Sequence, residues 1–227
     1  MKKIVVFTGA GISAESGINT FRDSDGLWEN HAIEDVATPE AWEKDPELVL
    51  DFYNTRRKQV LEVSPNIAHE SLISLEEKFD VTIITQNIDD LHERAGSSKI
   101  LHLHGEILKA KSASENEKKY PISGTELNIG ETCEDGYQLR PDVVWFGEAV
   151  PNMLKAATLC EDVDILIIVG TSLNVYPAAN IINFVPENCN KYLIDPKDVS
   201  PRGVKNLTLI KSNATVGVPN LINELLK

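Results

Sequence analysis

The fold is decided by residues 3–13, KIVVFTGAGIS, in which an apolar run of strand type is followed at once by a glycine-rich turn. Glycines at such a turn let the backbone approach a phosphate closely, and the N–H groups of a following helix can bind it. Gly17 falls too late for a strict dinucleotide fingerprint, so a tight strand–helix turn without a ligand remains open as the alternative. The segment predicts the first strand of a sheet, with a candidate phosphate loop at Gly9 and Gly11.

Further along the chain, short apolar runs rich in β-branched residues alternate with helical stretches. Several runs are apolar on both faces, as in strands buried in a parallel sheet between helices. With Ile4–Phe7, the expected strands are Val81–Thr85, Ile100–Leu103, Val143–Phe146, Ile165–Val169, Tyr192–Ile194 and Leu207–Ile210. The expected helices are Pro46–Val63, begun by Asp45 as N-cap, Ile67–Phe79, Asp90–Ala95, ended by Gly96, and Pro177–Phe184. This alternation predicts an α/β protein with a doubly wound parallel sheet.

Two segments interrupt the alternation. Residues 23–63 contain helical patterns but no convincing strand, and residues 109–140 are polar and rich in Lys, Glu, Ser and Gly. We interpret both as insertions that together form a small module. The α/β core would then comprise residues 1–22, 64–108 and 141–227.

Charge and cysteine content exclude several classes of protein. The chain has 22 basic and 35 acidic residues, a net charge of 22 − 35 = −13, with no basic block of the kind that nucleic acids or anionic membranes attract. The apolar run Ile4–Phe7 is too short for a signal peptide, and the strand runs fall far short of the ~20 residues of a membrane span. Cys133, Cys160 and Cys189 are odd in number and scattered, which is no disulfide framework. We therefore expect a cytoplasmic monomer with neither nucleic acid nor membrane as a partner.

Polar residues follow three of the expected strands, at the sheet edge where open α/β sheets bind ligands. Thr85-Gln86-Asn87-Ile88-Asp89 ends one strand, Gly170-Thr171-Ser172 follows another, and Asp195 ends a third. Hydroxyls and amides there suit a phosphate or a ribose, and an acidic side chain suits ribose hydroxyls. Helix capping by Asn87 or Asp89 is the alternative for the first run, but the convergence of these runs favours a nucleotide site.

The run His102-Leu103-His104-Gly105 offers two histidines on one face of a strand. The pair could bind a metal with a third ligand, but no H-x-x-E, C-x-x-C or nearby carboxylate cluster completes the set, so no metal is expected. His104, at a strand end beside glycine, could instead serve as a general base. A structural histidine with satisfied hydrogen bonds is the alternative.

Five runs together resemble the sirtuin family, and most of all its bacterial CobB-type protein-lysine deacylases. They are GAGISAESGINTFR (9–22), TQNIDDLH (85–92), HG (104–105), RPDVVWFGE (140–148) and GTSLNVYPAA (170–179), in the family's order and spacing over nearly the whole chain. The resemblance implies one catalytic unit of residues 1–227, a Rossmann-like NAD domain with a small module built from two insertions. It also implies an NAD-dependent deacylase that acts on acyl-lysine proteins and yields nicotinamide and 2′-O-acyl-ADP-ribose.

The resemblance assigns roles to particular residues. His104 would be the catalytic base, with Asn87 positioning water or ribose and Asp89 the departing nicotinamide. The NAD contacts would be Gly9, Ala10, Gly11, Ile12, Phe21, Arg22, Gln86, Asn87, Asp89, Gly170, Thr171, Ser172 and Asp195. The strand that pairs with the acyl-lysine peptide would contribute Val144, Phe146, Gly147 and Glu148. A mono-ADP-ribosyltransferase or NAD glycohydrolase, the rival reading, would keep the NAD pocket and lose this strand.

The chain departs from the family pattern in two places. Asp195 stands where sirtuins usually have an asparagine near the adenosine ribose, and a carboxylate can accept both ribose hydroxyls. Residues 109–140 normally carry four zinc cysteines, of which only Cys133 remains, with Ser112 about where the first would stand. One thiolate cannot make a tetrahedral site, so no zinc is expected, and the module would be held by packing alone or be partly disordered.

One expected helix carries an arginine on its apolar side. On a helical wheel of Leu48–Val63, Arg56 falls at the centre of the apolar arc and Arg57 nearer its edge. The alternative interpretation is structural: such an arginine can extend its head group to solvent or pair with a carboxylate. However, Tyr53 lies beside Arg56 on the same face, and Tyr53-x-x-Arg56 resembles the signature of sirtuins that remove succinyl and malonyl groups. We therefore expect desuccinylase and demalonylase activity, with deacetylation retained.

Overall fold

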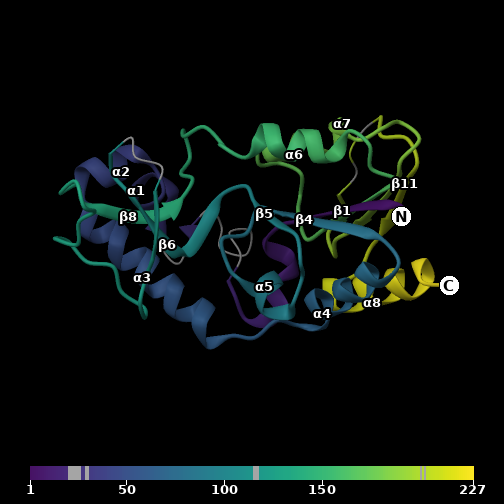
Figure 1. The fold of residues 1–227 in the computed structure, drawn as a ribbon, viewed down its shortest axis with the longest axis horizontal. Helices are drawn as coiled ribbons and strands as arrows, with labels where there is room; N and C mark the ends of the chain where they lie inside the picture. The colour runs from purple at the N-terminus through teal and green to yellow at the C-terminus, as the bar shows by residue number, and fades with distance from the viewer. Residues whose placement is uncertain (20–26, 29–30, 115–117, 200, 202) are drawn as a thin grey trace.

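The computed structural model describes residues 1–19, 27–28, 31–114, 118–199, 201 and 203–227. Six parallel strands form the main sheet, in the order β11-β10-β9-β1-β4-β5 (Figure 1). They are β1 (Lys3–Thr8), β4 (Asp80–Thr85), β5 (Ile100–His102), β9 (Ile165–Val169), β10 (Asn190–Ile194) and β11 (Leu207–Ile210). This is the strand order of a Rossmann sheet, which reverses between β1 and β9 and so opens a crevice there. The predicted fold class is confirmed.

Helices cover both faces of this sheet because its strands are apolar on both sides. Ile4 and Val6 of β1 pack in one cluster, and Val5 and Phe7 pack in the other. Figure 1 shows α6 and α7 along one face of the sheet and α4 and α8 along the other. The elements of these layers are η1 (Ala10–Ile12), η2 (Ala14–Ser16), α4 (Ile67–Ile73), η4 (Ser74–Glu77), α5 (Leu91–Ala95), α6 (Met153–Cys160), η5 (Ala178–Asn180), α7 (Ile181–Phe184) and α8 (Ala214–Leu225).

The small module lies beyond one edge of the sheet and contains helices and a sheet of its own. Its elements are β2 (Leu27–Trp28), β3 (His31–Ala32), α1 (Ile33–Val36), α2 (Pro39–Lys44), α3 (Pro46–Glu62), β6 (Gly105–Ser112), β7 (Lys119–Pro121) and β8 (Leu139–Val143). Strands β7, β6 and β8 form an antiparallel sheet in that order. An apolar cluster that includes Leu50 of α3, Leu127 and Leu139 joins the long helix to this sheet. Asp45 caps α3 by accepting from the Leu48 amide (3.0 Å), with Pro46 in the first turn, as expected.

Several local expectations are corrected. The expected strand Val143–Phe146 is wrong, because β8 ends at Val143 and the chain then turns. The expected helix Ile67–Phe79 is α4 followed by the 3-10 turn η4, and Pro177–Phe184 is likewise divided into η5 and α7. The pair β2–β3 and the antiparallel sheet were not expected from the sequence. Among the described residues, no helix is both long and apolar enough to cross a membrane.

Candidate active site

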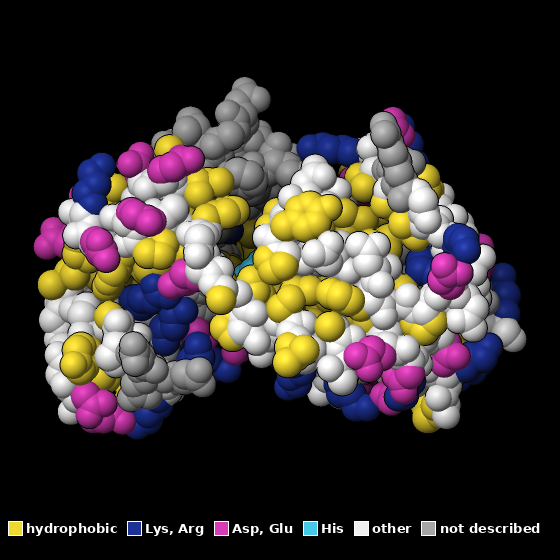
Figure 2. Space-filling model, turned by 90° about the horizontal axis from the view of Figure 1, so that it is seen from above, with side chains coloured by type: hydrophobic (Ala, Val, Ile, Leu, Met, Phe, Trp, Pro, Cys, Tyr) yellow, Lys and Arg dark blue, Asp and Glu magenta, His cyan; other side chains and the backbone are white. Residues whose placement is uncertain are grey.

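The carboxyl ends of β1, β4, β9 and β10 open into a cleft of about 1540 Å³. Figure 2 shows a hollow between the two lobes of the molecule, and residues of α3 and of the segment after β8 also line the cleft. Small-ligand pockets usually measure roughly 300–1,000 Å³, so this cleft has room for two ligands side by side. Phe21 and Arg22, two of the expected cofactor residues, lie outside the described part of the chain.

The glycine-rich turn after β1 meets the turn after β9 with no side chain between them. The Gly9 amide donates to Val169 O (3.0 Å), and the Gly11 amide donates to Gly170 O (2.9 Å). A Cβ on Gly11 would lie 2.6 Å from Gly170 Cα, and Gly170 itself has a φ of +63°. Two short 3-10 turns follow instead of a helix, and the Ile12 side chain is buried in the core rather than in the cleft. The glycines thus allow two strand ends to touch at the switch point of the sheet.

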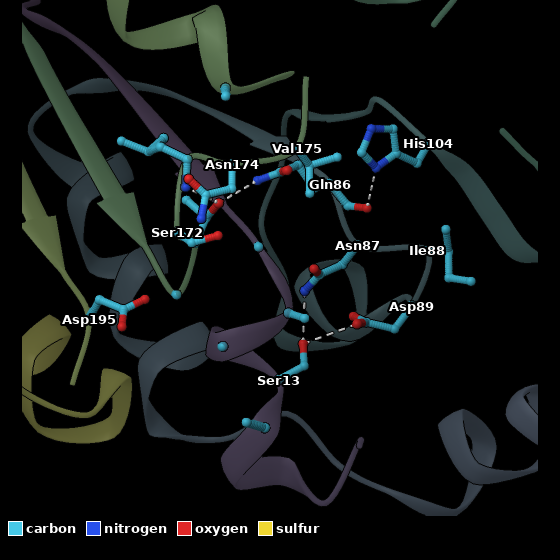
Figure 3. Close-up of a pocket in the computed structure, with 18 of the residues that line it drawn as sticks. Ser13, Gln86, Asn87, Ile88, Asp89, His104, Ser172, Asn174, Val175 and Asp195 are labelled. Atoms are coloured by element: carbon cyan, nitrogen blue, oxygen red, sulfur yellow. Dashed lines mark hydrogen bonds between the residues drawn. The ribbon is translucent and has the colours of Figure 1, made fainter. Parts of the chain in front are cut away.

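A buried network of side chains lies at the end of β4 (Figure 3). The Asn87 amide group donates to Ser13 Oγ (3.1 Å), and the Ser13 hydroxyl donates to Asp89 Oδ2 (3.0 Å). The Leu91 amide donates to Asp89 Oδ1 (3.2 Å), so Asp89 also serves the start of α5, as the capping alternative expected. Burial raises the pKa of Asp89, against the hydrogen bonds that it accepts. Ser13 was not predicted as a site residue, although it lies in the same GAGIS run.

The loops after β4 and β9 are joined across the cleft floor. Gln86 Nε2 donates to Thr171 Oγ1 (3.1 Å), and Asp195, which directly follows β10, is almost fully buried. The loop after β9 contributes two further lining residues, Asn174 and Val175, which the sequence analysis did not predict (Figure 3). The predicted residues that line the cleft are Gly9, Ala10, Gly11, Tyr53, Arg56, Gln86, Asn87, Asp89, His104, Val144, Phe146, Gly147, Glu148, Gly170, Thr171, Ser172 and Asp195.

His104 is held by a backbone carbonyl that determines which ring nitrogen is basic. Its Nδ1 lies 3.0 Å from Gln86 O, and because a carbonyl only accepts, Nδ1 carries the proton. The neutral ring therefore keeps Nε2 as its basic atom. Burial lowers the pKa of His104, partly opposed by this hydrogen bond. His104 therefore stays neutral, and competent to accept a proton, at neutral pH.

His102 does not join His104 in a shared site. Its Nδ1 donates to Asn87 O (2.9 Å), and its Nε2 lies 2.8 Å from Glu93 Oε1. The sequence predicted no carboxylate cluster near these histidines, but carboxylates do lie near His102. Ligand atoms of Glu93, His102 and Glu106 lie within 4.8 Å of one another. Both carboxylates have partners, however, since Glu106 Oε2 also lies 2.8 Å from Lys109 Nζ. The two histidines instead fasten consecutive carbonyls of the loop after β4.

The segment from residue 144 to residue 148 lines the cleft but already uses most of its amides. Four amides donate within the protein: Val144 to His104 O (2.9 Å), Trp145 to Glu148 Oε2 (2.8 Å), Phe146 to Ala37 O (3.0 Å) and Glu148 to Trp145 O (3.1 Å). The Glu148 carboxylate also binds Arg140 Nη2 (2.5 Å). A peptide that pairs here must therefore donate its own amides to the carbonyls of this segment, or accept from Gly147.

The two arginines of α3 have different surroundings. Arg56, 5% exposed, lines the cleft together with the fully buried Tyr53. Arg57 was expected nearer the edge of the apolar arc, but it is 0% exposed and more deeply buried than Arg56. Its Nε donates to Ile107 O (2.8 Å) and its Nη1 to Thr125 O (3.0 Å). Burial lowers the pKa of Arg57 to about 10.

Comparison with known proteins gives consistent matches over the chain. The profile of the Sir2 family matches residues 9–177. A protein of Bacteroides thetaiotaomicron described as an NAD-dependent protein deacylase is 52% identical over 226 residues, 97% of each chain. A Helicobacter pylori (strain J99) protein with the same description is 51% identical over 227 residues, 100% of this chain and 97% of its own.

Solved structures give the same result. A Sir2 homologue in complex with ADP-ribose superposes with a TM-score of 0.90 at 36% identity, covering 99% of this chain and 92% of that one. A Sir2 homologue in complex with NAD gives 0.89 at 37% identity, with 99% and 90% covered. Fold and sequence therefore agree over both the main sheet and the small module.

Proposed function

This chain belongs to the Sir2 family and is an NAD-dependent protein deacylase of the sirtuin type, and on that premise we propose that it removes succinyl and malonyl groups as well as acetyl groups from lysine side chains. The observation that carries the acyl preference is the pair Tyr53 and Arg56, buried on α3 and in contact with the cleft. A guanidinium binds a carboxylate through two parallel hydrogen bonds, and a phenol adds a third. An acetyl group has no carboxylate and would occupy the same pocket without these bonds.

The cleft suits NAD by its size and by its lining. The turns after β1 and β9 both line the cleft, and their glycines and the hydroxyls of Thr171 and Ser172 are of the kind that hold a diphosphate. Asp195 is suited to hold ribose hydroxyls, and Asn87 and Asp89 to hold the nicotinamide carboxamide. These residue roles are part of the proposal.

NAD supplies a ribose carbon that the acyl oxygen can attack as nicotinamide leaves. His104 Nε2 then takes a proton from a ribose hydroxyl, so that the ribose oxygen can attack the acyl carbon. The hydrogen bond from His104 Nδ1 to Gln86 O holds the ring in the required tautomer and steadies the imidazolium that forms. The protonated lysine amine would then leave the acyl carbon and one water would add to that carbon, so that the products are the free lysine, nicotinamide and 2′-O-acyl-ADP-ribose.

The decisive experiment compares acetyl-, succinyl- and malonyl-lysine peptides by mass spectrometry, with and without NAD. Arg56→Met should raise the KM for succinyl-lysine strongly, by roughly 2–3 kcal/mol for a lost charge-assisted pair, and affect acetyl-lysine far less. Lys58→Met, which removes a charge from the exposed side of the same helix, is the matched control and should change neither KM.

Two outcomes would contradict the proposal. Equal losses on both peptides in Arg56→Met would mean that Arg56 only supports the helix. Consumption of NAD without conversion of any acyl peptide would favour the rival NAD glycohydrolase or ADP-ribosyltransferase activity.

We also propose that the module folds without zinc. Ser112 Oγ lies 3.4 Å from Cys133 Sγ, and the two are buried against each other where the family's metal site would lie. Neither a hydroxyl nor a single thiolate can replace a set of four cysteines.

A further inference from the structure

The hydroxyl of Tyr53 has a single hydrogen-bond partner in the part of the chain that the structure describes. Trp145 Nε1 lies 3.1 Å from Tyr53 Oη, and the two side chains are 2% and 0% exposed. The bond joins α3 to the segment after β8, 92 residues further along the chain. The tyrosine proposed to contact the acyl group is therefore itself held by a tryptophan.

The chemistry of this bond determines what the phenol can offer. An indole N–H only donates, so the Tyr53 oxygen must accept, and its own proton remains available for another acceptor. Burial raises the pKa of Tyr53 further above its ordinary value, so the proton stays on the oxygen at any physiological pH. The phenol thus keeps a donor proton that its bond with Trp145 does not use.

Trp145 is in turn fastened on its other side. The guanidinium of Arg140 lies 3.6 Å from the centre of a Trp145 ring, in cation–π geometry. Glu148 holds both residues, because one of its oxygens binds Arg140 Nη2 (2.5 Å) and the other accepts from the Trp145 amide (2.8 Å). The indole is therefore fixed in position before any substrate arrives.

We propose that Trp145 is a specificity-positioning residue, whose indole N–H orients the Tyr53 hydroxyl as a donor and thereby favours acyl groups that end in a carboxylate. The inference rests on the proposed removal of succinyl and malonyl groups and extends it to a residue outside the Tyr53–Arg56 pair. Trp145 also lines the cleft, and in this proposal it acts through Tyr53.

The test uses the ratio of kcat/KM for succinyl-lysine to kcat/KM for acetyl-lysine. Trp145→Phe keeps an aromatic ring beneath Arg140 but removes the N–H, and it should lower this ratio about tenfold, mainly through the KM for succinyl-lysine. Tyr53→Phe should lower the ratio similarly, and the double variant should be no worse than either single one. Trp42→Phe is the matched control: its ring lies 5.8 Å from that of Trp145, and the ratio should stay at the wild-type value.

A measurement that needs no activity tests the bond itself. The chain has three tryptophans, and in a ¹⁵N–¹H spectrum Tyr53→Phe should shift the indole resonance of Trp145 most. An unshifted Trp145 resonance would overturn the inference. So would an unchanged ratio in a folded Trp145→Phe, or additive losses in the double variant. A wild-type protein that deacetylates but never desuccinylates would instead refute the proposed function, and the inference would fall with it.

Discussion

The carboxyl edge of the six-stranded sheet and the antiparallel module both hold polar loops in place, but with different groups. At the sheet edge, His104 and His102 each use one ring nitrogen to bind the carbonyls of Gln86 and Asn87. In the module, side chains of α3 do this work, and Arg57 binds the carbonyls of Ile107 and of residue 125.

The two regions differ in whether their polar side chains line the cleft or bind carbonyls of the protein itself. The loop after β4 is held through its carbonyls, and its own side chains, such as Asn87 and Asp89, line the cleft. Arg57 of the module also binds carbonyls, but it uses both Nε and Nη1 to do so and does not line the cleft. The adjacent arginines of α3 illustrate both cases, because Arg57 is enclosed by protein carbonyls while Arg56 lines the cleft. Substitutions at the sheet edge should therefore affect turnover, and substitutions inside the module should affect stability.

The largest effect is expected at the sheet edge, from His104→Ala. Removing the base should reduce acyl-lysine turnover by at least ~10²–10⁴-fold, with the melting temperature little changed. Steady-state assays of turnover and thermal unfolding of the same preparation check the two parts of this prediction. Turnover at the wild-type rate in this variant, or by the wild type without NAD, would refute the assigned role.

In the module, Arg57→Met should act on stability instead. The variant removes the donors to the buried carbonyl of Ile107 and the half-buried carbonyl of Thr125, and we expect a loss of about 3 kcal/mol in the free energy of unfolding. Urea unfolding measures it, with Lys58→Met on the exposed side of α3 as control. A loss no larger than that of the control would mean that the apolar cluster alone holds the module.

Buried histidines beneath the sheet edge should make the protein sensitive to acid. Burial lowers the pKa of His69 from 6.5 to about 4, and that of His92 well below its ordinary value. The folded protein then binds fewer protons than the unfolded chain, so stability is complete above pH 6.5 and falls as the pH drops below it. His69 alone should remove about 2 kcal/mol by pH 5. Urea titrations at pH 7 and 5 measure the change, and His69→Gln should reduce it; a pH-independent stability would contradict the expected burial.

The smallest expected effect is none at all, on treating the protein with a chelator. Because the module has one cysteine near the expected metal position, EDTA should leave the melting temperature unchanged and elemental analysis should find no stoichiometric zinc. Bound zinc, or unfolding on chelation, would show that other ligands replace the missing cysteines.

The pattern of the chain predicted the main sheet well because each of its strands is a local apolar run. Six of the seven expected strands lie in the sheet, and the polar residues that follow β1, β4, β9 and β10 meet at one cleft. Helix α8 could not be predicted in this way, since it contains Gly217 and Pro219. The glycine in this helix is explained by tertiary packing. A Cβ on Gly217 would lie 2.6 Å from Ile194 Cγ2, so the glycine permits close packing on β10.

By itself, the sequence determined the doubly wound sheet, the cleft residues at its edge and the family to which they belong, because these follow from short runs of neighbouring residues. Only the tertiary structure decided which arginine of α3 holds the module, which carbonyls the two histidines bind, and that Trp145 meets Tyr53. Each of these contacts joins residues between 15 and 92 positions apart in the chain. Local propensity says nothing of such distant pairs, since they form only when packing brings their elements together and burial requires every polar atom to find a partner.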